Sequence, residues 1–230
     1  MSIDINRIQA LCFDVDGTLS DTDNHFVEHI TNRLHPVRFL FPNGNAKPFA
    51  RRIVLASESP SNFLLGLPDM LGFDSLLFGL SDFIYRLGIR TNFADIDPIP
   101  GAVECIRMLQ SHYQLAIISN RGARSTQLFV DKFNLADSFR CIVSAQTCPR
   151  AKPYPDPIIW AADQMGILPE ACLMIGDTTV DIRAGRAAGA QTIGVLCGFG
   201  EEDELSREGA HLILQSTTDL PDLLLEIHPD

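Results

Sequence analysis

The chain is short of positive charge. Its 230 residues include 18 lysines and arginines against 29 aspartates and glutamates, a formal net charge of −11 at pH 7. A protein that binds the phosphate backbone of a nucleic acid needs a basic face, so this balance argues against a nucleic-acid partner. It does not exclude a small anionic substrate, because a local site can be positive or hold a metal ion within an acidic protein.

Zinc-type cysteine motifs and long apolar runs are also missing. None of the six cysteines forms a C-x-x-C pair, and no histidine cluster completes a zinc pattern. Several cysteines lie in apolar runs, so we interpret them as buried thiols in a reducing compartment. No run approaches the roughly 20 apolar residues of a membrane span, and the N-terminus lacks the features of a signal peptide. We therefore expect a cytoplasmic protein with no membrane partner.

From residue 99 onward, short apolar runs alternate with segments of helical period. Strands are predicted at 114–120, 139–145, 172–177, 191–197 and 211–216, and helices at 102–112, 125–135, 156–166, 180–189, 202–210 and 219–227. The stretch RIQALCFDVDG, residues 7–17, supplies one more strand. This alternation predicts an α/β fold in which a Rossmann-like parallel sheet is covered by helices on both faces.

Residues 22–97 have a different pattern. Segments 23–34, 46–57 and 74–87 are helix-like, and no strand is evident between them. Because this region separates the first strand from the others, we interpret it as a helical domain inserted after that strand. Residues 1–21 and 98–230 then form the α/β core domain.

Polar residues follow four of the predicted strands. In parallel sheets, ligands bind beyond the carboxyl ends of the strands, so these residues are candidate site residues. They are Asp14, Asp16 and Thr18 after the first strand, Ser119 and Asn120 after the second, Lys152 after the third, and Asp177 and Asp181 after the fourth.

Several carboxylates in one crevice need a neutralising cation or protons. Two like charges about 4 Å apart repel by roughly 4 kcal/mol at an effective dielectric of about 20. No cysteine or histidine stands among the candidate residues, so a hard divalent ion such as Mg²⁺ fits better than zinc. Ser119, Lys152 and backbone N–H groups near Gly17 and Asn120 are then available for phosphate oxygens.

The D-x-D pair allows a two-step reaction. One carboxylate can attack phosphorus and form an aspartyl-phosphate. The other can protonate the leaving alkoxide and later take a proton from water. Gly17 permits a sharp turn, so that the two carboxyl groups can address different atoms.

Each candidate also has a simpler interpretation. Asp14 and Asp16 before a glycine are compatible with an ordinary turn. Lys152 and Arg121 are compatible with exposed positions. Asp177 can cap a helix that starts near Thr179, with Asp181 in its first turn.

Together these residues resemble the motifs of the haloacid dehalogenase superfamily, in its phosphoglycolate-phosphatase-like branch. DVDGT at 14–18 resembles the first motif, ISN at 118–120 the second, AKPYPDP at 151–157 the third and GDTTVD at 176–181 the fourth. Segment 194–214 also resembles the tail of that branch. The inserted helical domain corresponds in placement to a cap, although its sequence shows no such likeness.

The resemblance implies a role for each residue. Asp14 would be the nucleophile and Asp16 the general acid/base, which argues against dehalogenation. Ser119 and Lys152 would bind substrate phosphate, and Thr18 and Asn120 are further candidates for substrate binding. Magnesium would be held by the Asp14 side chain, the Asp16 backbone carbonyl and Asp177, with Asp181 in support.

The sequence thus favours a magnesium-dependent phosphatase, a phosphoric monoester hydrolase acting on a small phosphorylated metabolite. Phosphoglycolate is the first substrate to test, by resemblance only. Two alternatives stay open. One is a β-phosphoglucomutase-like phosphotransferase, which would share all four motifs and differ in the cap. The other is a non-catalytic regulatory protein that keeps the fold.

Overall fold

The computed structural model describes residues 3–21, 30–50 and 97–225. Contacts between Cα atoms divide the chain into two compact units, one of Met1–Asp23 with Ile96–Asp230 and one of Asn24–Asp95. The predicted helix at 74–87 and most of those at 23–34 and 46–57 lie outside the described residues. The role of residues 22–97 as a cap stays a prediction.

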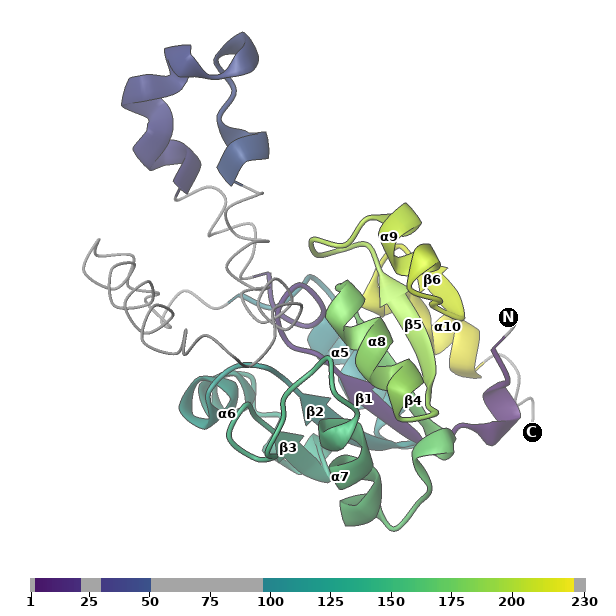
Figure 1. The fold of residues 1–230 in the computed structure, drawn as a ribbon. Coiled ribbons are helices and arrows are strands. Elements are labelled where there is room, and N and C mark those ends of the chain that lie inside the picture. The colour runs from purple at the N-terminus through teal and green to yellow at the C-terminus, as the bar shows by residue number, and fades with distance from the viewer. Residues whose placement is uncertain (1–2, 22–29, 51–96, 226–230) are drawn as a thin grey trace, which may run out of the picture. The chain divides into compact units, whose positions relative to one another are not determined.

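A six-stranded parallel sheet forms the centre of the first unit (Figure 1). Its strands have the order β3-β2-β1-β4-β5-β6. Their bounds are β1 Ala10–Phe13, β2 Gln114–Ile118, β3 Cys141–Val143, β4 Cys172–Gly176, β5 Gln191–Val195 and β6 Leu212–Leu214. The predicted α/β fold with a parallel sheet is confirmed, and β1, the most distant strand in sequence, lies between β2 and β4.

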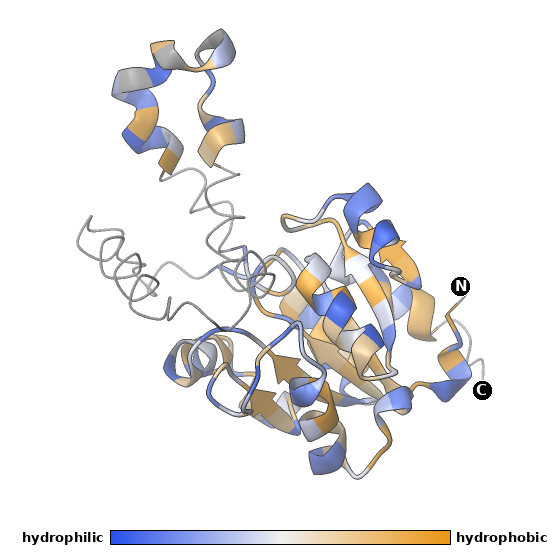
Figure 2. Ribbon diagram, in the orientation of Figure 1, coloured by the Kyte–Doolittle hydropathy of each residue, from blue (hydrophilic) through white to orange (hydrophobic). Residues whose placement is uncertain are grey.

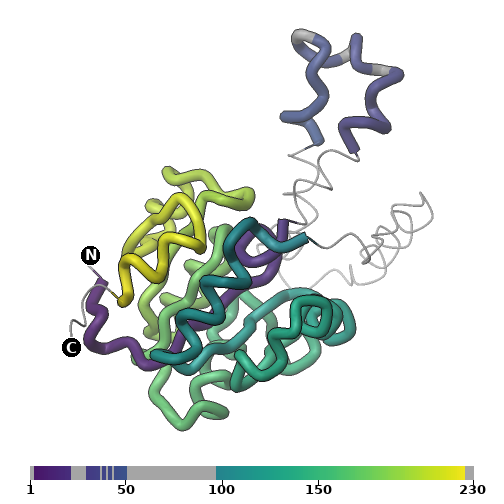
Figure 3. Tube along the Cα trace, turned by 180° about the vertical axis from the view of Figure 1, so that it is seen from behind, coloured from purple at the N-terminus to yellow at the C-terminus, as the bar shows by residue number. Residues whose placement is uncertain are grey.

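Helices cover both faces of this sheet. They are α5 Ala102–Leu109, α6 Ala123–Lys132, α7 Asp156–Met165, α8 Thr179–Ala187, α9 Glu202–Arg207 and α10 Leu220–Leu225, with short 3₁₀ turns between them. Helices α7 and α8 lie on the near face in Figure 1, whereas α5 and α10 come to the front in the reverse view (Figure 3). The two-layer cover explains why the strands read as continuous apolar runs.

Alternate residues of the strands supply two separate cores. On one face, Leu11 and Phe13 of β1 belong to a cluster with residues of α5, α6 and α10. On the other face, Ala10 and Cys12 belong to a cluster with residues of α7 and α8. Figure 2 shows the resulting pattern, with hydrophobic colours along β1 and β2 and mixed colours along the covering helices.

The predicted helix at 125–135 is shifted in the structure. Helix α6 begins at Ala123 and ends at Lys132. Two residues beyond its end, Asn134 has a φ of 52°. This left-handed conformation is incompatible with a continuing helix, and asparagine is one of the residues that tolerate it.

The sequence of the first unit is interrupted once, between Asp23 and Ile96. The backbone N–H of Asp21 donates to the carbonyl of Asp97 at 2.9 Å, and the N–H of Ile99 donates to the carbonyl of Leu19 at 2.9 Å. The outgoing and returning chain segments therefore lie side by side, which is compatible with an insertion at this point.

Of the second unit, residues 30–50 are described. Residues 30–34 and 47–50 are helical, and 3₁₀ turns span His35–Leu40 and Pro42–Gly44. Within the ranges that the structure covers, no helix is both long enough and apolar enough to cross a bilayer.

Candidate active site

Asp14, Lys152 and Asp181 form a buried ion-paired group at the carboxyl end of the sheet. Asp14 follows β1 directly, and Asp181 lies in the first turn of α8. The Nζ atom of Lys152 donates to Oδ1 of Asp14 at 2.7 Å and to Oδ1 of Asp181 at 2.6 Å. All three residues are at most 7% exposed, which rules out the exposed position considered for Lys152.

Asp181 also organises the start of its own helix. Its Oδ2 atom accepts hydrogen bonds from the backbone N–H and the hydroxyl of Thr178, at 3.1 and 2.7 Å. Thr178, rather than Asp177, is therefore the N-cap of α8. The ammonium of Lys152 contacts Oδ1 of Asp181 and Thr178 contacts Oδ2, so Asp181 links the lysine to the start of α8, and its support of a metal site stays a prediction.

Asp177 follows β4 and is fully buried. Its Oδ1 atom accepts a long hydrogen bond of 3.4 Å from the hydroxyl of Thr18, and its Oδ2 atom accepts one of 2.8 Å from the backbone N–H of Phe199. The Thr18 side chain thus contacts a candidate metal ligand, and its predicted contact with substrate stays a prediction.

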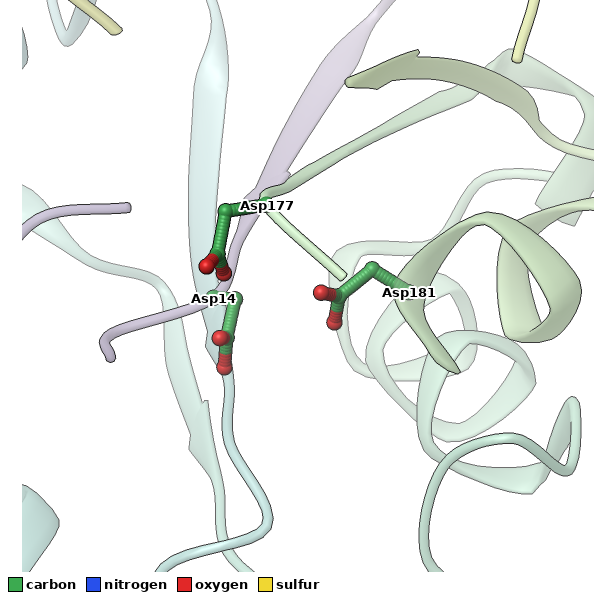
Figure 4. Close-up of side chains that lie close together, drawn as sticks. All are labelled: Asp14, Asp177 and Asp181. Carbon is green, nitrogen blue, oxygen red and sulfur yellow. The ribbon is translucent and has the colours of Figure 1, made fainter. Parts of the chain in front are cut away.

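Carboxylate oxygens of Asp14, Asp177 and Asp181 lie within 4.8 Å of one another. Figure 4 shows Asp14 and Asp177 projecting from neighbouring strand ends, with Asp181 pointing toward them from α8. These three buried acids are accompanied by one ammonium, that of Lys152. All the side-chain atoms that could coordinate a metal ion are carboxylate oxygens. A hard divalent cation such as Mg²⁺ fits both the donor type and the excess of negative charge.

The pKa values of Asp14 and Lys152 reflect both their burial and the charges around them. Burial raises the pKa of Asp14 to about 7, with Asp181 and Asp16 adding to the effect and Lys152 opposing it. Burial alone would lower the pKa of Lys152, but the charges of Asp14 and Asp181 outweigh it and raise that pKa. Lys152 therefore stays protonated, and the acids around it need a further positive charge.

Asp16, two residues after Asp14, points to a different partner. The guanidinium of Arg121 binds its carboxylate with two N–H groups, and the Nε–Oδ2 distance is 2.6 Å. The chain turns directly after Asp16, where Gly17 has a φ of 68°, a conformation that glycine adopts most readily. The two carboxylates are therefore held by different cations.

Ser119 and Asn120 position the loop after β2. The Ser119 hydroxyl accepts a hydrogen bond of 3.1 Å from the backbone N–H of Arg121. The Asn120 amide exchanges two hydrogen bonds with the backbone of Lys152, at 3.0 and 3.1 Å. Asn120 thus holds the backbone that carries the buried lysine, and phosphate binding by Ser119 and Asn120 stays a prediction.

Two features of the site were not predicted from the sequence. The sequence is compatible with an exposed position for Arg121, and its ion pair with Asp16 depends on the tertiary fold. The loop after β5, Cys197–Gly200, also contacts the site, and the four motifs do not include it. The sequence signal for this loop is Gly-Phe-Gly after the predicted strand 191–197. The carboxyl ends of all strands in a parallel sheet lie at the same edge, so this loop is expected near the site.

Comparison with known proteins gives a consistent result. Residues 11–195 match the haloacid dehalogenase-like hydrolase family. A phosphoglycolate phosphatase from Nitrosococcus oceani is 31% identical over 126 residues, which cover 54% of this chain and 56% of that protein. This alignment thus spans only about half of each protein. An N-acetylmuramic acid 6-phosphate phosphatase from Pseudomonas aeruginosa is 29% identical, and the alignment covers 95% of each protein.

Among solved structures, a haloacid dehalogenase family hydrolase from Deinococcus radiodurans with bound phosphate and sodium has a TM-score of 0.70. It is 27% identical, and the match covers 96% of each chain. The predicted resemblance is confirmed. Because the matched residues make up most of the chain and include every acid of the buried cluster, this protein belongs to the haloacid dehalogenase-like hydrolase family.

Proposed function

We propose that the protein is a magnesium-dependent phosphatase that hydrolyses a small phosphorylated metabolite through an aspartyl-phosphate on Asp14. The observation that carries the proposal is the convergence of Asp14, Asp177 and Lys152 at the carboxyl edge of the sheet. The Nζ atom of Lys152 lies 2.7 Å from Oδ1 of Asp14, and all three residues are buried. In the proposed reaction, this arrangement would supply a nucleophile, a metal-ligand acid and a phosphate-binding cation in one place.

In the first step, an oxygen of Asp14 attacks phosphorus and the bond from phosphorus to the leaving oxygen breaks. Asp16 supplies a proton to that leaving oxygen. In the second step, Asp16 takes a proton from water, and the resulting hydroxide attacks phosphorus and releases inorganic phosphate from Asp14. Lys152 and Ser119 hold the phosphate oxygens, with Asn120 and Thr18 in further predicted contacts.

The proposed Mg²⁺ ligands are the carboxylates of Asp14 and Asp177 and the backbone carbonyl of Asp16, with Asp181 in support through Lys152 and Thr178. When bound, the ion would neutralise negative charge on the transferred phosphoryl group. The names of the curated relatives support a small phosphorylated substrate, and phosphoglycolate and N-acetylmuramic acid 6-phosphate are the first two to test. The cytoplasmic location and the lack of nucleic-acid and membrane partners stay predictions.

The test measures phosphate release by the purified protein with Mg²⁺ from these two compounds and from a wider metabolite panel. We expect release from at least one compound, and Asp14→Asn should abolish it with an unchanged circular dichroism spectrum, because an amide is a far poorer nucleophile. Asp137→Asn, at an exposed position, is the matched control. More than about one hundredth of wild-type turnover in Asp14→Asn would contradict the nucleophile role.

The same panel separates the alternatives. Conversion of β-glucose 1-phosphate to the 6-phosphate in the presence of a bisphosphate activator, without free phosphate, would support a phosphotransferase. Absence of turnover on every compound would favour a regulatory protein.

A further inference from the structure

The loop after β5, Cys197–Gly200, packs against the two parts of the site that would hold the metal ion. The backbone N–H of Phe199 donates to Oδ2 of Asp177 at 2.8 Å. The Sγ atom of Cys197 donates to the carbonyl of Gly17 at 3.3 Å. The loop therefore contacts both the turn that follows β1 and the acid that follows β4.

The glycines of this loop permit its close approach. A Cβ atom on Gly198 would lie 2.1 Å from Oδ2 of Asp177 and 2.6 Å from the carbonyl oxygen of Gly17. A Cβ atom on Gly200 would lie 1.8 Å from the carbonyl oxygen of Asp177. Real Cβ atoms do not approach other atoms this closely, so no larger residue fits at either position without movement of the acid or the turn.

Neighbouring contacts hold the loop and the turn in place. The Phe199 side chain is buried, with 4% of its surface exposed. On the other side of the turn, the hydroxyl of Thr217 donates to the carbonyl of Thr18 at 2.6 Å. The buried Phe199 side chain and the contacts of the turn thus hold the Phe199 N–H against Oδ2 of Asp177.

We propose that Cys197–Gly200 is a positioning element of the metal site, which orients the Asp177 carboxylate through the Phe199 N–H and fixes its placement relative to the Gly17 turn. The inference rests on the proposed function, because it assumes that Asp177 and the Asp16 carbonyl bind the ion. Outer-shell partners of this kind orient metal ligands, and their loss typically weakens metal affinity 10- to 100-fold.

The test measures Mn²⁺ and Mg²⁺ binding to the metal-free protein by calorimetry, without substrate. Gly198→Ala should weaken affinity at least about tenfold while the circular dichroism spectrum stays that of the wild type, because the new methyl group displaces Asp177. Gly122→Ala is the matched control. Its φ of −65° suits alanine, and its Cβ atom would lie 3.4 Å from the flexible Gln146 side chain, so its affinity should stay within about twofold of wild type.

Equal affinities of Gly198→Ala and wild type would overturn the inference and leave the proposed metal site intact. No binding by the wild-type protein would overturn both. If Gly198→Ala does not fold, NMR of the wild-type protein labelled with ¹⁵N-phenylalanine tests the inference instead. On Mg²⁺ addition the Phe199 amide resonance should shift more than that of Phe129, which lies within α6, and an unmoved Phe199 resonance would overturn the inference.

Discussion

Lys152 determines the charge balance of the buried site. It is the only cation that contacts Asp14 and Asp181 among the ion pairs of the described residues, and its side chain is 3% exposed. Its cost of burial is offset by two short ion pairs, so loss of the ammonium would leave two buried acids facing each other.

We therefore expect Lys152→Met to lower the free energy of unfolding by about 3–5 kcal/mol in the absence of metal, the range for loss of one partner of a buried ion pair. Chemical denaturation monitored by circular dichroism measures it. Lys132→Met, an exposed lysine at the end of α6, is the control and should change stability by less than about 1 kcal/mol. Similar effects of both substitutions would contradict the importance of the buried pair.

Arg121 gives the proposed acid, Asp16, its orientation. The bidentate contact fixes the plane of the Asp16 carboxylate. A lysine would not do so, because only a guanidinium offers two parallel N–H groups. The Arg121 side chain is 12% exposed and that of Asp16 25%, so the pair is partly buried and still in contact with solvent.

For Arg121→Met we expect kcat on an alkyl phosphate such as phosphoglycolate to fall about tenfold or more, within the range attributed to general acid catalysis. The decrease on p-nitrophenyl phosphate should be smaller, because that leaving group needs little protonation. Arg121→Lys should restore part of the loss. A decrease of equal size on both substrates would indicate that Arg121 acts on binding or on the nucleophile instead.

At the scale of secondary-structure elements, His211, directly before β6, adds a side-chain contact to β5. The Nδ1 atom of His211 accepts a hydrogen bond of 3.1 Å from the backbone N–H of Thr192. Burial lowers the pKa of His211, and the charges of Arg186 and Arg7 lower it further. Protonation would remove the acceptor and add a positive charge near Arg186 and Arg7.

The pH dependence follows from this lowered pKa. The unfolded chain binds the proton at its ordinary pKa of about 6.5, whereas the folded chain does so only at lower pH. The contribution of His211 is fully present above about pH 6.5 and is lost as pH falls through the folded pKa. Compared with His211→Gln, the wild type should therefore lose stability between pH 7.5 and 5, measured by denaturation at each pH. A constant difference between the two proteins would contradict this assignment.

At the scale of the whole molecule, the first unit has its own hydrophobic cores. The two chain segments between which the second unit is inserted lie close together. The hydrogen bond between Asp21 and Asp97 brings the two chain segments together, so a short linker can join them. Closing a short loop costs less entropy than closing a long one.

We expect a chain in which residues 23–96 are replaced by a short glycine–serine linker to fold cooperatively. Thermal unfolding followed by circular dichroism measures this, with the full chain as reference. The cap role predicted for this region adds a further expectation: activity on small metabolites should fall, because a cap excludes water and supplies substrate contacts. A non-cooperative transition would mean that the second unit is needed for the fold of the first.

The amino-acid sequence alone predicted the parallel sheet, the succession of strands and helices along the chain and the acids at the carboxyl edge of the sheet. Those features are local: a strand apolar on both faces needs cover on both sides, and strands that run in parallel end at the same edge. The sequence thereby also predicted that Asp14, Lys152, Asp177 and Asp181 belong to one site.

Only the tertiary structure decided which partner each of these residues takes. Lys152 contacts Asp14 and Asp181, Arg121 binds Asp16, and the N–H of Phe199 binds Asp177, across separations in sequence of 138, 29, 105 and 22 residues. Such choices depend on side-chain direction, on the left-handed turn at Gly17 and on how closely the glycines of Cys197–Gly200 let one loop approach another. Local pattern carries no information on those distances, because they are set by the packing of the whole sheet.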